Sequence, residues 1–246
     1  MPLPEQFIIV GGPSRSGTNT ASTFLHLHDD VLMWHTFSVD KGRPITQSND
    51  IVRDLEDSFP AGLQVVAGNE EIHAWKAIVK ELNANADINS KYRGVRWDYA
   101  ELRVRHFREA IRVPMRFVYC MRNLFDVFCS QAYAGYFRYP EKDSWKEAMR
   151  LFSLKIHESF DYALKIREMG IPIYAHEAGD DLSGLLGFIG IEANELQRKW
   201  LAELPVTNWT PGQRYLTLKQ ILKKQVEISE HLLERFRFVK QSLQTV

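Results

Sequence analysis

The chain has 246 residues, of which 45% are hydrophobic, and its 31 Lys and Arg balance 31 Asp and Glu. That length and hydrophobic content are enough for a sizeable core, and we expect one domain over residues 1–246 rather than two small ones. The zero net charge provides no global field to attract nucleic acid or an anionic membrane, so any anion site must be local.

The two cysteines, Cys120 and Cys129, do not make a disulfide framework and fit a reducing compartment. No window approaches the roughly 20 apolar residues of a membrane span, and the N-terminus has no basic segment followed by a long apolar stretch. We therefore expect a soluble, cytoplasmic protein without a membrane span.

Residues 7–27, FIIVGGPSRSGTNTASTFLHL, combine an apolar run, a turn rich in Gly, Ser and Thr, and a return to helical spacing. The pattern predicts a buried strand over 7–10, a loop beginning at Gly11, and a helix whose Phe24 and Leu27 face the core. The free amides of such a loop and of the helix N-terminus converge on one point, where the helix dipole also favours negative charge. The segment therefore predicts a phosphate or sulfate site.

This loop differs from the nucleotide-binding pattern G-x-x-x-x-G-K-[ST]. Gly12 and Gly17 have the right interval. However, Thr18 replaces the lysine and Asn19 replaces the hydroxyl residue that holds magnesium, and a kinase or ATPase needs both. The cation is instead Arg15, inside the loop, so the loop could hold an anion without a metal.

Residues 115–137, MRFVYCMRNLFDVFCSQAYAGYF, repeat the order of apolar run, helix start and helical stretch. Asn123 can cap the helix with Asp126 three residues later, where a carboxylate lies favourably near the positive helix end. Arg122 is then expected at the carboxyl end of a strand, and Ser130 about two turns into the helix.

Further elements are expected along the chain. Residues 28–50 and 208–215 are expected to be loops, and Asp98 is expected to cap a helix. Residues 143–169 and 218–239 each predict an amphipathic helix. Alternating strands and helices imply an α/β protein, a three-layer α/β/α fold with a mostly parallel central sheet, in which ligands bind beyond the carboxyl ends of the strands. Both expected anion sites follow such ends, so they can share one crevice.

Residues 13–20, PSRSGTNT, resemble the 5′-phosphosulfate loop of sulfotransferases, which use 3′-phosphoadenosine 5′-phosphosulfate (PAPS) as donor. The typical family pattern is Pro-[Arg or Lys]-Ser-Gly-Thr-Thr. It is matched from Arg15 to Thr18, whereas Ser14 is an insertion and Asn19 replaces the second threonine. The resemblance implies a fold like that of the P-loop NTPases.

The second segment resembles the same family. In sulfotransferases an arginine that closes a strand and a serine eight residues later bind the 3′-phosphate of the donor. Arg122 and Ser130 have this interval. Residues 122–126 also match the Arg-[Asn or Asp]-x-x-Asp sequence with which the family starts this segment. Two matches in the same chain order make a coincidence unconvincing.

The resemblance implies a role for each matched residue. Arg15 is expected to stabilise charge on the departing phosphate oxygen, with no metal required. When the family's His-Pro-Asp-Val element is laid on residues 28–31, His35 falls where tyrosylprotein-type members have a glutamate base; His26 and His28 come next. The residues expected around the 5′-phosphosulfate are Ser14, Arg15, Ser16, Gly17, Thr18 and Asn19.

Two other stretches match the family less closely. Many members cover the adenosine with an aromatic and a basic residue near the position of residues 208–215. Trp209 and Arg214 have these side chains, although Trp209 would equally anchor a surface turn. Members also carry Lys-[Thr or Ser]-Pro where this chain has Arg96, Trp97 and Asp98, which leaves Arg96 as a candidate active-site cation.

The function implied is transfer of a sulfuryl group from PAPS to a hydroxyl or amine, with release of adenosine 3′,5′-bisphosphate (PAP). The acceptor would be a small molecule, a lipid or a saccharide. Two alternatives stay open. One is a P-loop kinase or other phosphoryl transferase, against which Thr18 argues, and the other is a catalytically inactive PAP-binding protein.

Overall fold

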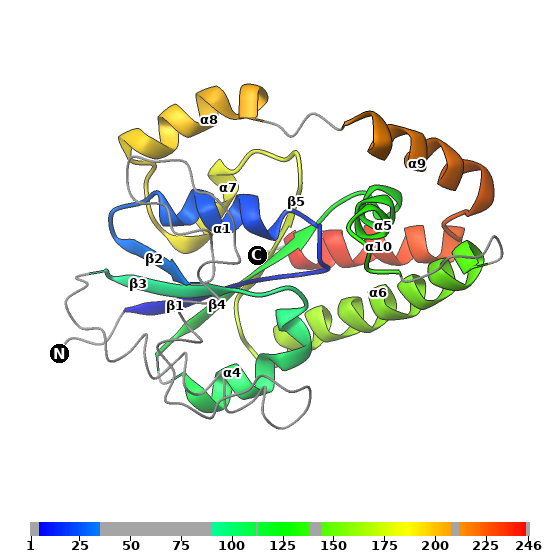
Figure 1. The fold of residues 1–246 in the computed structure, drawn as a ribbon. Coiled ribbons are helices and arrows are strands. Elements are labelled where there is room, and N and C mark those ends of the chain that lie inside the picture. Colours follow the sequence, from blue (N-terminus) through cyan, green and yellow to red (C-terminus); the bar gives the residue numbers. More distant parts are fainter. Residues whose placement is uncertain (1–4, 35–89, 112, 138–143, 208–211, 245–246) are drawn as a thin grey trace, which may run out of the picture.

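The computed structural model of the protein describes residues 5–34, 90–111, 113–137, 144–207 and 212–244. In this part of the chain a parallel five-stranded sheet has the order β2-β3-β1-β4-β5. Helices lie on both faces of the sheet (Figure 1), so the predicted three-layer α/β/α fold is confirmed. The strands are β1 (Gln6–Gly11), β2 (Val31–Trp34), β3 (Tyr92–Arg96), β4 (Met115–Met121) and β5 (Ile173–Glu177).

Two groups of helices cover the sheet. Helices α1, α7 and α8 lie over one face, whereas α4, α5, α6 and α10 lie over the other and α9 packs against α5 (Figure 1). The predicted helix over 143–169 is confirmed as α6. The helical segments are α1 (Thr18–His26), the 3-10 turn η1 (Ala100–Arg103), α4 (Val104–Ala110), α5 (Leu124–Tyr133), α6 (Ser144–Glu168), α7 (Ser183–Ile189), α8 (Glu195–Thr207), α9 (Gln213–Gln225) and α10 (Glu230–Gln244).

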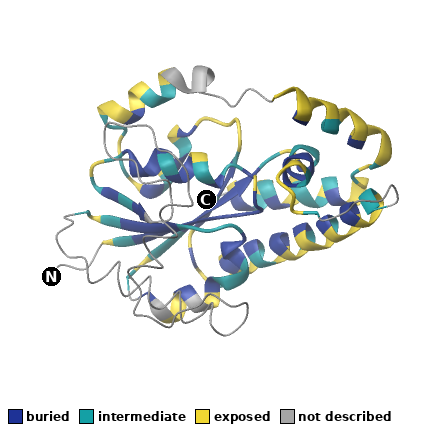
Figure 2. Cartoon of the chain, viewed as in Figure 1, coloured by how far each residue is buried: buried dark blue, intermediate teal, exposed yellow. Residues whose placement is uncertain are grey.

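The central strands supply core to both faces, because successive side chains of a strand point to opposite sides. In β1, Ile8 and Val10 pack in the cluster formed with α1 and α7, whereas Phe7 and Ile9 join the cluster formed with α5 and α6. All four side chains are buried, and Figure 2 shows β1 and β4 buried along most of their length. A parallel sheet covered on both faces needs such continuous apolar runs.

The order of the strands determines where the loops meet. β1 lies between β3 and β4. The chain leaves β1 through α1 toward the β2 edge, returns to β3, and then crosses to β4 on the other side of β1. Loops that leave a central strand in opposite directions open a crevice at the carboxyl ends of the strands. Val10 pairs with Arg96 and Gly11 with Tyr119, so β1 and β3 end within one residue of each other and β4 continues to Met121 beside the loop.

Two predicted loops contain regular structure. Strand β2 lies within residues 28–50, because Val31 and Met33 fill the core beside α1; residues 35–50 lie outside the described ranges. The prediction of a loop over 208–215 is wrong from Gln213 onward, because Gln213 begins α9. Residues 208–211 of this stretch lie outside the described ranges.

The helix predicted over 218–239 is interrupted. α9 ends at Gln225, Val226 has an extended backbone (φ −135°, ψ 149°), and α10 begins at Glu230. Val226 and Ile228 in the connection pack against the core, so their apolar side chains continue the pattern although the backbone is not helical. In the described ranges no helix is long and apolar enough to cross a membrane.

Ile156 provides a test of how α6 packs on the sheet. Its side chain is fully buried, whereas Leu154 on the same helix is 54% exposed. Ile156→Ala should lower the free energy of unfolding by about 2–5 kcal/mol, because removing buried carbon atoms leaves a cavity. Urea denaturation measures the loss, and Leu154→Ala is the matched control, with an expected change within about 0.5 kcal/mol. Equal losses in the two variants would contradict the assigned buried face.

Candidate active site

The loop after β1 makes a tight turn at the carboxyl end of this central strand. A Cβ atom on Gly12 would lie only 2.3 Å from the backbone oxygen of Cys120, so the loop can pass β4 only with glycine at this position. Inside the loop, the Ser16 amide donates to the Pro13 carbonyl (3.0 Å). Three residues of the loop have positive φ angles: Gly12 (122°), Arg15 (73°) and Gly17 (98°).

The start of the loop is fixed by the segment that follows β3. The Gly12 amide donates to Glu101 Oε2 (3.0 Å), and the Gly12 carbonyl accepts from the Tyr99 amide (2.8 Å). Glu101 is fully buried, and Ser159 of α6 donates to its Oε1. Ser159 also shares a hydrogen bond with the Tyr119 hydroxyl of β4 (2.6 Å). Burial raises the pKa of the Glu101 carboxyl to about 7, because its charged form is poorly solvated there.

The middle of the loop is held by α5 and the residues after it. The Arg15 Nε–H group donates to Ser130 Oγ (2.9 Å), which brings together two motifs that are 115 residues apart. Gln131 Nε2 donates to the Ser14 carbonyl (2.9 Å), and the Ser14 and Tyr136 hydroxyls share a hydrogen bond (2.9 Å). Ser14 is therefore one of the points at which α5 and the residues after it hold the loop.

Thr18, at the lysine position of the nucleotide-binding pattern, lies beside an ion pair at the end of β3. Thr18 Oγ1 donates to Asp98 Oδ1 (3.1 Å) and accepts from Arg96 Nε (3.3 Å), while Arg96 Nη2 contacts the same Asp98 oxygen (3.0 Å). The prediction that Asp98 caps a helix is wrong, because its carboxylate binds these partners and Tyr99 is the residue that precedes η1. The candidate cation Arg96 is thus beside the loop.

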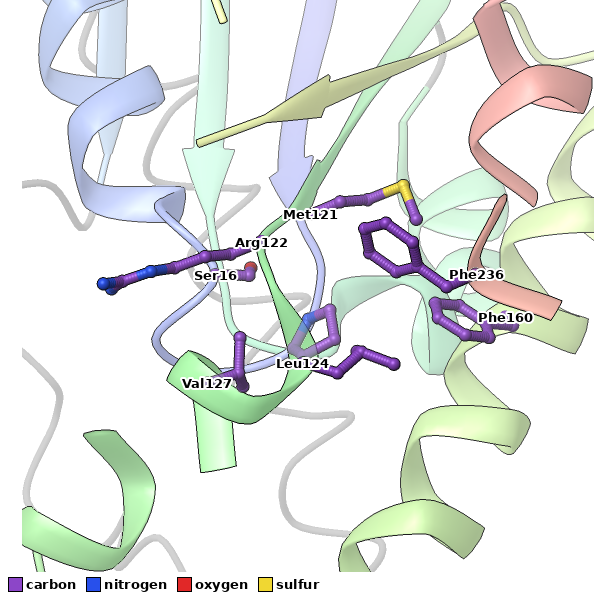
Figure 3. Close-up of a pocket in the computed structure, with 8 residues that line it drawn as sticks. Ser16, Met121, Arg122, Leu124, Val127, Phe160 and Phe236 are labelled. Atoms are coloured by element: carbon purple, nitrogen blue, oxygen red, sulfur yellow. The ribbon is translucent and has the colours of Figure 1, made fainter. Parts of the chain in front are cut away.

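Arg122 directly follows β4, as predicted, and Asn123 caps α5 by accepting a backbone amide bond (3.2 Å). Arg122 and Ser16 line one small pocket, together with Phe160 and Phe236. Figure 3 shows the Arg122 side chain extending away from the two phenylalanine rings, with Ser16 close to where it leaves the strand. Arg122 and the loop therefore lie at the same edge of the sheet.

The structure presents several groups of the loop that suit an anion. Among the described residues, no backbone carbonyl accepts from the amides of Arg15, Gly17 or Thr18. The Ser16 hydroxyl and the Asn19 side-chain oxygen are buried without a protein partner in the described part of the chain. A buried polar group without a partner requires an explanation, and a ligand oxygen would satisfy the Ser16 hydroxyl. These ranges hold no group of three His, Cys, Asp or Glu side chains that could bind a metal.

The remaining predicted residues have different positions. His35 and Trp209 lie outside the described residues. Arg214 is exposed in the first turn of α9, and the adjacent Tyr215 packs edge-on against a tyrosine of α5 (ring centroids 5.6 Å). The two other candidate bases have structural contacts: Nδ1 of His26 accepts from the Met33 amide (3.2 Å), and Nδ1 of His28 accepts from a neighbouring amide (3.1 Å).

Sequence reasoning missed the residues that support the loop from behind. Glu101, Gln131 and Tyr136 match no motif, and their partners are distant in sequence. One signal was available for Ser159, because it is a polar residue on the apolar stripe of α6, close to Ile156 and Phe160. A serine at such a position is expected to have a buried hydrogen-bond partner.

Comparisons with known proteins place the fold. No protein-family model matches the sequence, and no curated protein matches it. Among solved structures, the sulfotransferase STF9 from Mycobacterium avium matches with a TM-score of 0.53 and 10% sequence identity. The match covers 98% of this chain and 77% of that protein. The chain therefore has the fold of a sulfotransferase.

Glu101→Gln tests the buried carboxyl. Its pKa of about 7 in the folded state exceeds the ordinary value of 4.5. Between these values the folded state holds more protons than the unfolded state, so the carboxyl's contribution to stability falls as the pH rises, by about 3 kcal/mol in all. Glutamine does not ionise, so the free energy of unfolding of Glu101→Gln should rise relative to that of wild type by roughly that amount between about pH 4.5 and 8. Urea unfolding at both pH values measures this difference, and Glu234→Gln, at an exposed position, is the control. If the unfolding free energies of Glu101→Gln and wild type changed in parallel with pH, the raised pKa of Glu101 would be contradicted.

Proposed function

We propose that the protein transfers a sulfuryl group from PAPS to a hydroxyl or amine acceptor. The observation that carries this proposal is the hydrogen bond from Arg15 Nε to Ser130 Oγ (2.9 Å). It joins the loop expected to bind the 5′-phosphosulfate to the helix expected to bind the 3′-phosphate. The fold shared with a sulfotransferase supports the same class of reaction.

In this proposal Arg15 stabilises negative charge on the departing phosphate oxygen. A guanidinium has five N–H donors, and the described residues use only the Nε–H of Arg15. The other four remain for the donor, beside the free amides of the loop. Charged hydrogen bonds that are already oriented toward a developing charge are an effective form of catalysis. Ser14, Ser16, Gly17, Thr18 and Asn19 complete the proposed 5′-phosphosulfate site.

The 3′-phosphate would be bound by Arg122 and Ser130, whose positions near the loop support one continuous donor site. Arg214 is proposed to contact the same end of the donor, because the adjacent Tyr215 packs against Tyr133 on α5, the helix that carries Ser130. Trp209 is proposed to cover the adenosine. His35 is proposed as the base that takes the acceptor proton, since an imidazole suits proton removal near neutral pH.

The proposal also distinguishes PAPS from nucleoside triphosphates. Thr18, which replaces the P-loop lysine, is hydrogen-bonded to Asp98, so this position offers a triphosphate no cation of its own. The same proposal describes a single-domain, cytoplasmic enzyme, in which the buried thiols of Cys120 and Cys129 stay reduced.

A thermal-shift comparison of PAP, PAPS, ATP and GTP tests the choice of donor. Stabilisation by PAP and PAPS is expected, and a preference for magnesium-ATP would contradict it.

Arg122→Ala should weaken PAP binding by about 1.5–3 kcal/mol, because a charged hydrogen bond to the 3′-phosphate is lost. Isothermal titration calorimetry measures the change. Arg108→Ala, at an exposed position of α4, is the control and should bind PAP as the wild type does. Unchanged PAP affinity in Arg122→Ala would remove Arg122 from the site.

His35→Ala should lower the rate of sulfuryl transfer by about 10²–10⁴-fold, the usual contribution of a general base, with little change in PAP affinity. Transfer of labelled sulfate from PAPS to a panel of phenolic, lipid and sugar acceptors measures the rate. A wild-type rate in this variant would assign the base to another residue.

A further inference from the structure

We propose that Glu101 is a positioning residue of the donor loop and that its carboxyl takes up a proton when the donor binds. The inference rests on the proposed function, since it requires a polyanion on the loop. It concerns a residue that is fully buried behind the loop. Glu101 acts through Gly12, whose amide it holds.

The geometry ties Glu101 to three elements at once. Its Oε2 accepts from the Gly12 amide at the start of the loop (3.0 Å), and its Oε1 accepts from Ser159 of α6. Ser159 in turn shares a hydrogen bond with Tyr119 of β4 (2.6 Å). The Glu101 side chain is 0% exposed. A carboxyl in this position cannot turn toward water when its charge changes.

The surroundings provide no compensating cation. In the described ranges Glu101 has no Lys, Arg or His within ion-pair distance. On α6, the Lys155 ammonium lies over the Tyr99 ring (4.3 Å from its centroid). Asp98, on the segment after β3, adds a like charge that disfavours ionisation of Glu101.

Three other buried acidic groups surround Glu101: the hydroxyls of Tyr99 and Tyr119 and the thiol of Cys120. Burial raises the pKa of Tyr99, of the Tyr119 hydroxyl and of the Cys120 thiol well above their ordinary values. Of the imidazoles on the elements packed nearby, His157 of α6 stacks on His231 of α10 (ring centroids 5.5 Å). Among these buried groups, Glu101 is the one whose pKa burial raises to about 7, because its charged form is poorly solvated there.

The hydrogen bonds are compatible with both states of the carboxyl. When it is ionised, it accepts from the Gly12 amide and from the Ser159 hydroxyl. When it is protonated, Oε1–H donates to Ser159 Oγ, because either of Ser159 and Tyr119 can donate in the bond between them. Oε2 accepts from Gly12 in both states. The loop therefore stays in place while the charge behind it changes.

A polyanion on the loop would repel the ionised carboxyl and so favour its protonated form. By linkage, donor binding takes up a proton, and donor affinity falls as the pH rises through the range in which Glu101 ionises. Coupling free energies between two sites are typically about 1–3 kcal/mol, or about 5–150-fold in affinity, so the loss of affinity is on the order of tenfold. A purely structural role would weaken binding equally at every pH.

The test is calorimetry of PAP binding to the full chain at about pH 6 and about pH 8.5, in buffers of low and high ionisation enthalpy. PAP has phosphate groups that titrate near pH 6, but this contribution is shared by all variants. We therefore compare the ratio of wild-type to Glu101→Gln dissociation constants, with exposed Glu234→Gln as control. The ratio should rise about tenfold with pH, and wild type should take up more protons than Glu101→Gln.

Ser159→Ala provides a second test that does not require Glu101→Gln to fold. Ser159 favours the ionised carboxyl by donating to it, so its removal should move the fall in PAP affinity to higher pH. Dissociation-constant ratios that stay constant with pH, or equal proton uptake in wild type and Glu101→Gln, would overturn the inference while leaving the proposed function intact. Absence of PAP binding to the wild type at either pH would instead overturn the proposed function.

Discussion

The loop from Gly12 to Gly17 depends on being held from behind by groups far away in the sequence. Both backbone polar groups of Gly12 bond to the Tyr99–Glu101 segment, and Arg15 bonds to Ser130 of α5. These contacts fix the arrangement of the loop amides. An anion site arranged in advance costs less reorganisation when the ligand arrives, which is the physical basis of electrostatic preorganisation.

The sheet explains why these supports converge. β1 is paired with β3 on one side and β4 on the other, so the segments after all three strands emerge together. The segment after β3 provides Glu101, the segment after β4 provides Arg122 and Ser130, and the loop lies between them. In the proposed function, the 3′- and 5′-phosphates of the donor would be bound at two points of this end of the sheet. The solved sulfotransferase STF9 shares the overall fold of this chain at 10% sequence identity.

The sequence permits prediction of what depends on neighbours in the chain. The apolar run of residues 7–10 and the turn after it specify β1 and the loop, and Asn123 specifies the start of α5. The approach of the two motifs also follows from alternating strands and helices. The contacts between Arg15 and Ser130, however, and between Ser14 and α5, require the packed structure.

Long-range contacts explain the errors. Asp98 has the side chain of a helix cap, but it bonds to Thr18, which is 80 residues away. Glu101 resembles any helical surface glutamate in the sequence, yet its partners Gly12 and Ser159 are 89 and 58 residues away. The break after Gln225 was missed because Val226 and Ile228 keep apolar spacing while packing from a non-helical connection.

A crystal structure of the protein with PAP tests the central claim most directly. The account predicts the 3′-phosphate within hydrogen-bond distance of Arg122 and Ser130, and the 5′-phosphate in the loop from Gly12 to Asn19. PAP bound elsewhere, or Arg15 and Arg122 directed to separate surfaces in the complex, would contradict it.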